Sequence, residues 1–164
     1  MKGTVHYEVK DGVAILTVDN PPVNPLSDGV RAGFVNNIDK AENDPDVLGV
    51  VLTGAGRSFI AGADISEFGK NPDGPGLDEA FRKLEFCSKP VVAAINGSAL
   101  GGGLETALVC NYRIAGPAAF VGLPEVNLGL LPGAGGTQRL PRLVGPAEAL
   151  KMMLTGMHVN AKKA

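Results

Sequence analysis

The sequence predicts an α/β fold, formed by a single domain of 164 residues. Short apolar runs, typical of buried strands, alternate along the chain with segments whose apolar residues recur at helical spacing. Hydrophobic residues make up 45% of the chain, which allows a sizeable core, and many of the 23 glycines cluster between the expected elements. This alternation indicates the α/β class but not which α/β fold is formed. No domain boundary is predicted between residues 1 and 164.

The first half of the chain is expected to form a β-hairpin, a helix, a strand and a second helix. The hairpin is predicted because two segments of alternating apolar and polar residues flank Asp11-Gly12, a pair typical of tight turns. A rigid loop rich in proline follows, and Ser27 is placed to cap the next helix. The expected elements are strands 4–9 and 13–18, the loop 20–25, a helix carrying Val30, Phe34, Ile38 and Ala41 that ends over 43–46, strand 47–52, a mobile surface loop 71–76, and a helix carrying Leu77, Phe81 and Leu84.

The second half is expected to continue this alternation. A buried apolar strand precedes three consecutive glycines, Gly101 to Gly103, and a helix follows them. Two short strands and two helices then complete the chain. The expected elements are strand 91–95, helix 104–110, strands 113–115 and 120–121, and helices 137–143 and 147–154.

Charge and composition exclude several classes of partner. The net charge is −2 and no basic block is present, so nucleic acid is not expected to bind. Cys87, Cys110, His6 and His158 fit no metal-binding spacing, and no metal site is predicted. The N-terminus lacks the apolar segment of a secretory signal, and no apolar run reaches transmembrane length. A membrane partner is therefore not expected either.

The glycine-rich loops are the first candidate ligand site. None of them completes the Gly-x-Gly-x-x-Gly pattern of dinucleotide-binding loops or a P-loop, so no nucleotide cofactor is predicted. A strand, a loop of small residues and a helix follow one another twice, around residues 61–65 and 99–105. Two backbone N–H groups from such loops can form an oxyanion hole, and a helix that begins after Gly102 would add its positive end. Close backbone packing accounts for the same glycines equally well, so both interpretations stay open.

Three segments together resemble the crotonase superfamily. They are residues 59–65 (Phe-Ile-Ala-Gly-Ala-Asp-Ile), residues 99–105, and residues 123–140, which include the specific run Gly-Leu-Leu-Pro-Gly-Ala-Gly-Gly-Thr-Gln-Arg-Leu. The resemblance covers essentially the whole chain in the right order. It is strongest to the N-terminal hydratase/isomerase part of bifunctional β-oxidation enzymes, a subgroup favoured by Glu67-Phe68-Gly69 and by Tyr-Arg-Ile-Ala at 112–115.

The resemblance implies a spiral of repeated ββα units and the hydration of a 2-enoyl-CoA thioester. The backbone N–H groups of Ala63 and Gly102 would hold the thioester oxygen, while Glu105 would activate water and Glu125 would serve C2. Coenzyme A is part of that substrate, so no separate cofactor is expected. The substrate- and CoA-binding residues that it implies are Pro22, Val23, Asn24, Ala61, Gly62, Asp64, Ile65 and Gly101.

Four of the charged residues also have alternative roles. Taken alone, Glu105 would be an ordinary glutamate of a first helical turn, and Glu125 an ordinary loop charge. Asp64 is expected to cap the helix after the Ala63 loop rather than to react. For Arg139, a structural salt bridge is favoured over a contact with a phosphate.

The family pattern normally continues beyond residue 164, so we expect C-terminal helices that cover the acyl pocket and make subunit contacts to be missing. The expected partners are an acyl-CoA thioester and either further copies of the chain or a dehydrogenase portion. The expected location is cytoplasmic, or peroxisomal in a eukaryote. The alternatives to hydration are Δ3-Δ2 isomerisation on the same glutamates, another crotonase chemistry such as thioester hydrolysis, and an inactive fragment that binds acyl-CoA.

Overall fold

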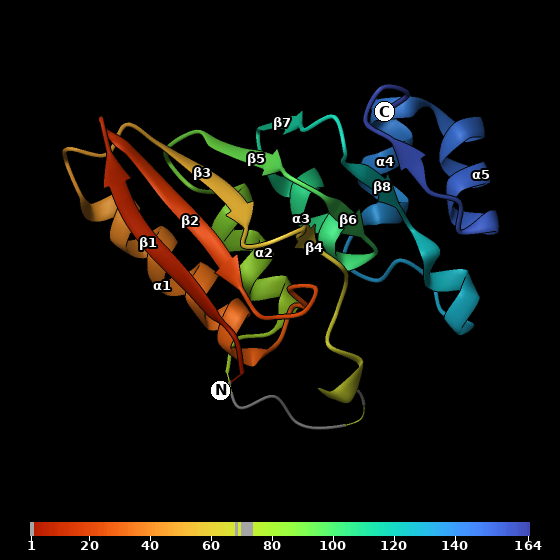
Figure 1. The fold of residues 1–164 in the computed structure, drawn as a ribbon, viewed down its shortest axis with the longest axis horizontal. Helices are drawn as coiled ribbons and strands as arrows, with labels where there is room; N and C mark the ends of the chain where they lie inside the picture. Colours follow the sequence, from red (N-terminus) through yellow and green to blue (C-terminus); the bar gives the residue numbers. More distant parts are fainter. Residues whose placement is uncertain (1, 68, 70–73) are drawn as a thin grey trace.

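The computed structural model describes residues 2–67, 69 and 74–164, and the strands in these ranges form two sheets (Figure 1). The larger sheet has the order β1-β2-β3-β5-β7 and the smaller one the order β4-β6-β8-β9. The strands are β1 (Thr4–Lys10), β2 (Val13–Asp19), β3 (Gly49–Gly54), β4 (Ser58–Ile60), β5 (Val91–Ile95), β6 (Ser98–Leu100), β7 (Tyr112–Ala115), β8 (Phe120–Gly122) and β9 (Val159–Asn160). The helices are α1 (Asp28–Asn43), α2 (Leu77–Glu85), α3 (Gly102–Val109), α4 (Gly136–Val144) and α5 (Pro146–Thr155), with 3-10 turns η1 (Ile65–Glu67) and η2 (Pro124–Leu128).

Three ββα units wind through the two sheets as a spiral. In each of the pairs β3/β4, β5/β6 and β7/β8, the first strand joins the larger sheet and the second joins the smaller sheet. The successive units pair in parallel within both sheets, and a helix follows each pair, namely α2, α3 and α4. The expected spiral of ββα units is therefore confirmed, and so is the α/β class.

A hairpin and a long helix precede the spiral. β1 and β2 pair antiparallel around Asp11 and Gly12, whose φ angles of 50° and 76° are those of the tight turn that the sequence predicts. α1 packs on the sheet with the apolar face formed by Val30, Phe34, Ile38 and Ala41, which are all buried, as the helical spacing predicts. In Figure 1, this part lies at the end of the molecule opposite to α4 and α5.

The expectation that the Ser27 side chain caps α1 is wrong. Ser27 occupies the N-cap position, but its hydroxyl donates to the carbonyl oxygen of Lys2 and accepts a 2.9 Å hydrogen bond from the Asn20 amide. The first N–H groups of the helix find other acceptors. Asp28 N donates to Glu67 Oε1 at 2.8 Å, and the N–H of the next residue, Gly29, donates to the Lys2 carbonyl at 3.1 Å.

The remaining differences concern short elements. β3 begins at Gly49 rather than at residue 47, and the strands β4, β6 and β9 and the turn η2 were not expected. β4 is three residues long and buried at every position, so it shows no alternation that a sequence pattern could reveal. Of the surface loop expected at 71–76, residues 71–73 lie outside the described residues.

The core extends directly to the start of the loops that follow the smaller sheet. Ile60 at the end of β4 and Leu123 after β8 are fully buried, and so is Ala99 within β6. Loops that leave well-packed residues have fixed starting points, so the groups they carry are held in place. Across the described ranges, the structure contains no helix that is long and apolar enough to cross a membrane.

Candidate functional site

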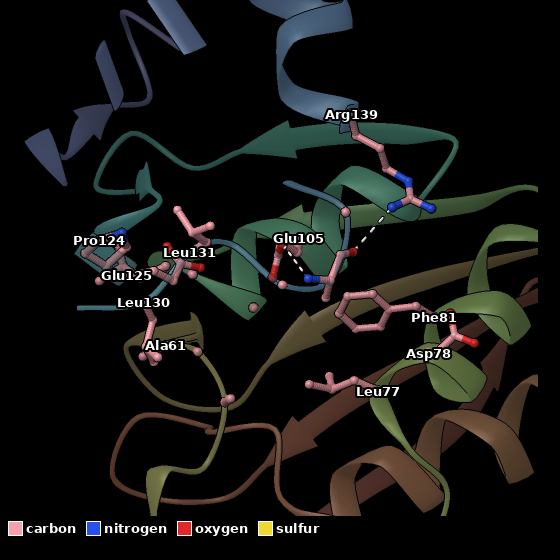
Figure 2. Close-up of a pocket in the computed structure, with 18 of the residues that line it drawn as sticks. Ala61, Leu77, Asp78, Phe81, Glu105, Pro124, Glu125, Leu130, Leu131 and Arg139 are labelled. Carbon is pink, nitrogen blue, oxygen red and sulfur yellow. Dashed lines mark hydrogen bonds between the residues drawn. The ribbon is translucent and has the colours of Figure 1, made fainter. Parts of the chain in front are cut away.

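A cavity of about 530 Å³ opens at the C-terminal ends of β4, β6 and β8 (Figure 2). These strands are parallel neighbours, so the loops that follow them meet at one edge of the smaller sheet. Helix α2 forms another wall with Leu77 and Phe81, and the segment before α4 closes a third side. The cavity is therefore built by segments from all three units of the spiral.

Two backbone N–H groups lie side by side in this cavity. A Cβ atom placed on Gly102 would be 3.5 Å from the backbone nitrogen of Ala63, so the loops after β4 and β6 are in contact at this point. Within residues 2–67, 69 and 74–164, neither the Ala63 N–H nor the Gly102 N–H donates a hydrogen bond. Gly102 is also the first residue of α3, whose positive end faces the same place. Two free donors of this kind can stabilise a developing oxyanion.

The three consecutive glycines, Gly101 to Gly103, lie in different structural environments. Gly101 has φ +53° and ψ −125°, a backbone conformation that residues with a side chain rarely adopt. A Cβ atom on Gly103 would lie 1.8 Å from the carbonyl oxygen of Ile60, so this glycine permits close packing of α3 on β4. Close backbone packing is therefore confirmed for Gly103, whereas the oxyanion hole stays a prediction for Gly102, which lines the cavity.

Glu105 lies on α3 and is only 3% exposed. Its Oε1 atom accepts two backbone hydrogen bonds, from Ala134 N at 2.9 Å and from Gly136 N at 2.8 Å. Its Oε2 atom has no hydrogen bond within the described residues, and Glu105 is one of the residues that line the cavity. Glu105 is therefore a buried carboxylate with one fixed and one free oxygen, not an ordinary solvated glutamate.

Glu125 approaches the cavity from η2, on the loop after β8. Its Oε2 atom is buried and has no hydrogen-bond partner among the described residues. Burial raises the pKa of Glu125 above its usual value, and the negative charge of Glu105 raises it further. A Cβ atom on Gly101 would lie 3.1 Å from Glu125 Oε1, so this glycine leaves room for the carboxyl group. A raised pKa favours the protonated form of the carboxyl group, which can donate a proton.

The residues expected to bind the substrate separate into two groups. Ala61, Gly62, Ile65 and Gly101 line the cavity. The Asp64 carboxylate instead accepts hydrogen bonds from Ser66 N at 3.0 Å and Ser66 Oγ at 2.7 Å, and Lys2 Nζ lies 3.1 Å away. The Ser66 hydroxyl and Lys2 lower the pKa of Asp64. The expectation that Asp64 caps the turn after Ala63 is confirmed, because it holds the start of η1.

Pro22, Val23 and Asn24 do not line the cavity. Pro22 and Val23 are exposed, so their expected contact with the CoA tail stays a prediction. Asn24 is buried, and its amide donates to the carbonyl oxygens of Ala55 and Ser58, each at 2.9 Å. The Asn24 side chain therefore connects its loop to the start of β4, and the carbonyl of Val23 accepts a hydrogen bond from Ala61 N at 3.1 Å. These contacts hold Ala61, a residue of the cavity wall, against the loop of residues 20–25.

Several residues of the site could not be assigned from the sequence. The N–H groups of Ala134 and Gly136 hold Glu105, and the glycine-rich run that contains them carries no sign of this contact in the sequence. The salt bridge expected for Arg139 is confirmed, and its partner is Glu85, with Nη2–Oε2 at 2.7 Å and Nε–Oε1 at 3.1 Å. No signal in the sequence pairs these two residues. The apolar walls are formed by Leu77, Phe81, Leu128, Leu130 and Leu131.

Comparison with known proteins relates the whole described fold to one family. The family described as "Enoyl-CoA hydratase/isomerase" matches residues 8–164. The "Peroxisomal bifunctional enzyme" of Danio rerio is 54% identical over 159 residues, which cover 96% of this chain and 22% of that protein. The "Probable enoyl-CoA hydratase" of Bacillus subtilis (strain 168) is 46% identical over 167 residues, covering 98% of this chain and 65% of that protein.

Solved structures show the same likeness. A crystal structure of enoyl-CoA hydratase from Bacillus anthracis superposes with a TM-score of 0.90 at 35% identity, covering 98% of this chain and 66% of that one. A structure from Geobacillus kaustophilus HTA426, described as an enoyl-CoA hydratase subunit, has a TM-score of 0.90 at 40% identity, covering 98% of this chain and 65% of that one. The chain thus spans about two thirds of these structures and less than a quarter of the bifunctional relative.

Proposed function

Because the chain belongs to the enoyl-CoA hydratase/isomerase family, we propose that it adds water across the 2,3 double bond of a 2-enoyl-CoA thioester in fatty acid β-oxidation. One observation carries the proposal. A free pair of N–H groups, on Ala63 and Gly102, shares one cavity with the two carboxyl groups of Glu105 and Glu125. Hydration of a conjugated thioester needs both parts, one for charge on oxygen and one for two proton transfers.

The N–H pair would bind the thioester carbonyl oxygen. When water adds at C3, negative charge develops on that oxygen, and donors already aimed at it stabilise the enolate-like state. A single donor of this kind typically contributes about 10²–10³ in rate. The two donors come from separate units of the spiral and need no reorganisation during the reaction.

The two glutamates would divide the proton transfers. The free oxygen of Glu105 accepts a proton from the attacking water, whose oxygen bonds to C3. Protonated Glu125 delivers a proton to C2, in agreement with the raised pKa of this residue. The product is a 3-hydroxyacyl-CoA, and return of a proton from Glu105 to Glu125 through solvent restores the enzyme. The reaction consumes one water and no electrons, so the proposal requires no cofactor besides the CoA portion of the substrate.

Hydration of crotonyl-CoA tests the proposal, followed as loss of the absorbance of the conjugated thioester. Glu105→Gln and Glu125→Gln should each lower the turnover by about 10²-fold or more, as expected for positioned acid–base groups. Glu8→Gln, on the exposed face of β1, is the matched control and should retain wild-type turnover. Full activity in either of the first two variants would overturn the proposed roles.

A second candidate is Δ3-Δ2 isomerisation at the same site. It requires one base to move a proton between C2 and C4, and the unpaired carboxyl group of Glu125 favours that residue. Glu125→Gln should then lower isomerisation more than Glu105→Gln does. A chain that binds acyl-CoA but changes none of these substrates would instead favour a binding role.

The relatives also support a proposal for the cellular location and the protein partners of the chain. Three of the similar proteins carry peroxisomal or glyoxysomal names, from Danio rerio, Brassica napus and Arabidopsis thaliana. We propose a peroxisomal location if the chain is eukaryotic and a cytoplasmic one otherwise. A dehydrogenase portion or further copies of the chain are the proposed protein partners.

A further inference from the structure

The ion pair between Arg139 and Glu85 lies next to residues 134–136, the segment that holds Glu105. Arg139 belongs to α4 and Glu85 is the last residue of α2, so the pair joins two helices that form different walls of the cavity. The guanidinium makes two hydrogen bonds to the carboxylate, at 2.7 and 3.1 Å. Its third nitrogen, Nη1, donates to the carbonyl oxygen of Ala134 at 3.3 Å.

The segment Ala134-Gly135-Gly136 is enclosed between Arg139 and Glu105. On one side, the N–H groups of Ala134 and Gly136 donate to Glu105 Oε1. On the other side, a Cβ atom on Gly135 would lie 1.9 Å from Arg139 Nη1, so the guanidinium occupies the space of the missing side chain. The contacts of Ala134 to both residues appear as dashed lines in Figure 2. A shift of the guanidinium therefore moves the two donors that fix Glu105.

The pair is suited to fixing geometry rather than to adding stability. The side chains of Arg139 and Glu85 are 29% and 33% exposed, and partly exposed ion pairs contribute little to the free energy of unfolding. A bidentate guanidinium–carboxylate contact, by contrast, defines the plane and direction of both groups. Its main consequence is that the third guanidinium nitrogen stays on the Ala134 carbonyl.

We propose that Arg139 and Glu85 are positioning residues for Glu105, acting through the backbone of Ala134 and Gly136. The inference rests on the proposed function, in which the free oxygen of Glu105 accepts the proton of water. Without the pair, the amides of Ala134 and Gly136 no longer hold Glu105 Oε1 in a fixed position. The other oxygen of the same carboxylate, Oε2, then no longer has a fixed orientation in the cavity. Misplacement of a reacting group by about 1 Å can lower the rate by about 10²-fold.

The experiment uses two variants that break the pair from opposite ends, Arg139→Met and Glu85→Gln. Arg142→Met, on the same helix, is the matched control, because Arg142 is exposed and donates within its own helix to Gln138. Hydrogen exchange of the Ala134 and Gly136 amides, measured by NMR, reports directly on the bonds to Glu105. Crotonyl-CoA hydration then gives kcat and KM separately.

In both test variants we expect the two amides to exchange at least about tenfold faster and kcat to fall about 10- to 100-fold. KM should stay within about threefold, since the pair does not itself position the thioester. Arg139→Lys should recover part of kcat, because it keeps the charge but not the bidentate contact. A KM effect with unchanged kcat would assign Arg139 to substrate binding and overturn the inference.

Glu85→Gln keeps the inference testable if Arg139→Met does not fold, because it changes one atom of a partly exposed side chain. Unchanged exchange of both amides in a folded variant overturns the positioning role whatever the activity. If the wild-type chain hydrates crotonyl-CoA and Glu105→Gln abolishes this, the proposed function stands independently of that result. If the wild type shows no hydration, the proposed function fails, and amide exchange still decides whether the pair holds Glu105.

Discussion

Substitution of Gly136 by alanine should displace the carboxylate of Glu105. A Cβ atom at this position would lie 2.9 Å from Glu105 Oε1, 3.1 Å from Pro132 Cβ and 3.2 Å from Glu105 Cγ. Ordinary contacts of this kind begin at 3.4 Å, so the carboxylate must retreat by about 0.5 Å. Side-chain ends often move at little cost, but this one is held by the N–H groups of Ala134 and Gly136 itself.

The expected magnitude follows from that distance. Since a 1 Å misplacement can cost about 10²-fold in rate, half of it should lower kcat by about tenfold. The free energy of unfolding should decrease, because the added methyl group overpacks the site. Overpacking costs about 1–3 kcal/mol, and the usual advantage of alanine over glycine applies to helix interiors, whereas Gly136 is the first residue of α4. The variant should therefore fold, with a destabilisation of about 1–3 kcal/mol.

Steady-state hydration of crotonyl-CoA and a thermal melt, run on the same preparations, measure both effects. Gly116→Ala is the matched control, because its Cβ atom would meet nothing closer than the Ile95 carbonyl at 3.6 Å. The control should keep the wild-type kcat. Wild-type kcat in Gly136→Ala, with the fold intact, would refute the reasoning that the placement of Glu105 limits the rate.

Two further predictions concern the other groups of the cavity. Gly102→Pro removes the N–H of the oxyanion hole and should abolish turnover, whereas Gly102→Ala keeps the N–H and should retain measurable turnover; equal kcat in folded forms of both would exclude this donor. The pKa of Glu125 is raised by folding, so the folded chain binds more protons than the unfolded chain between the usual glutamate pKa, about 4.3, and the raised value. Its contribution to the free energy of unfolding therefore decreases as the pH rises through that window. Glu125→Gln should gain stability relative to the wild type with rising pH, measured as the difference in Tm, and a difference that is constant with pH would contradict the burial of this carboxyl group.

The longer elements of the fold could be predicted because their patterns are local. β5 has the expected bounds, and α1 buries the four residues that its spacing marks. β4, β6 and β9 have two or three residues each, and their existence depends on partner strands that are distant in the sequence. Ser27 shows the same limit at the level of one side chain. Its hydroxyl contacts Lys2, 25 residues away, in place of the helix that it precedes.

The site was predictable in its composition rather than in its geometry. The segments around Ala63 and Gly102 could be recognised as candidates for donors, but their contact across two loops could not be predicted from the sequence. In the sequence, Glu105 has the appearance of a surface residue. The amides that bind its carboxylate lie 29 and 31 residues further along the chain. The pairing of Arg139 with Glu85 spans 54 residues and leaves no periodic signal.

The spiral also determines the order in which the site can form. The first turn contributes Ala63 after β4, the second contributes Gly102 and Glu105 on α3, and the third contributes Glu125 after β8. Because every turn packs mainly on its predecessor, contacts along the spiral can form progressively, as in repeat proteins. Partial unfolding of the last turn would remove Glu125, together with the N–H groups of Ala134 and Gly136 that hold Glu105, while the donor pair of the earlier turns stays assembled. Under the proposed function, such a species would keep the donors for a thioester oxygen but would have lost Glu125 and the fixed position of Glu105, so ligand affinity and turnover would be lost at different stages of denaturation.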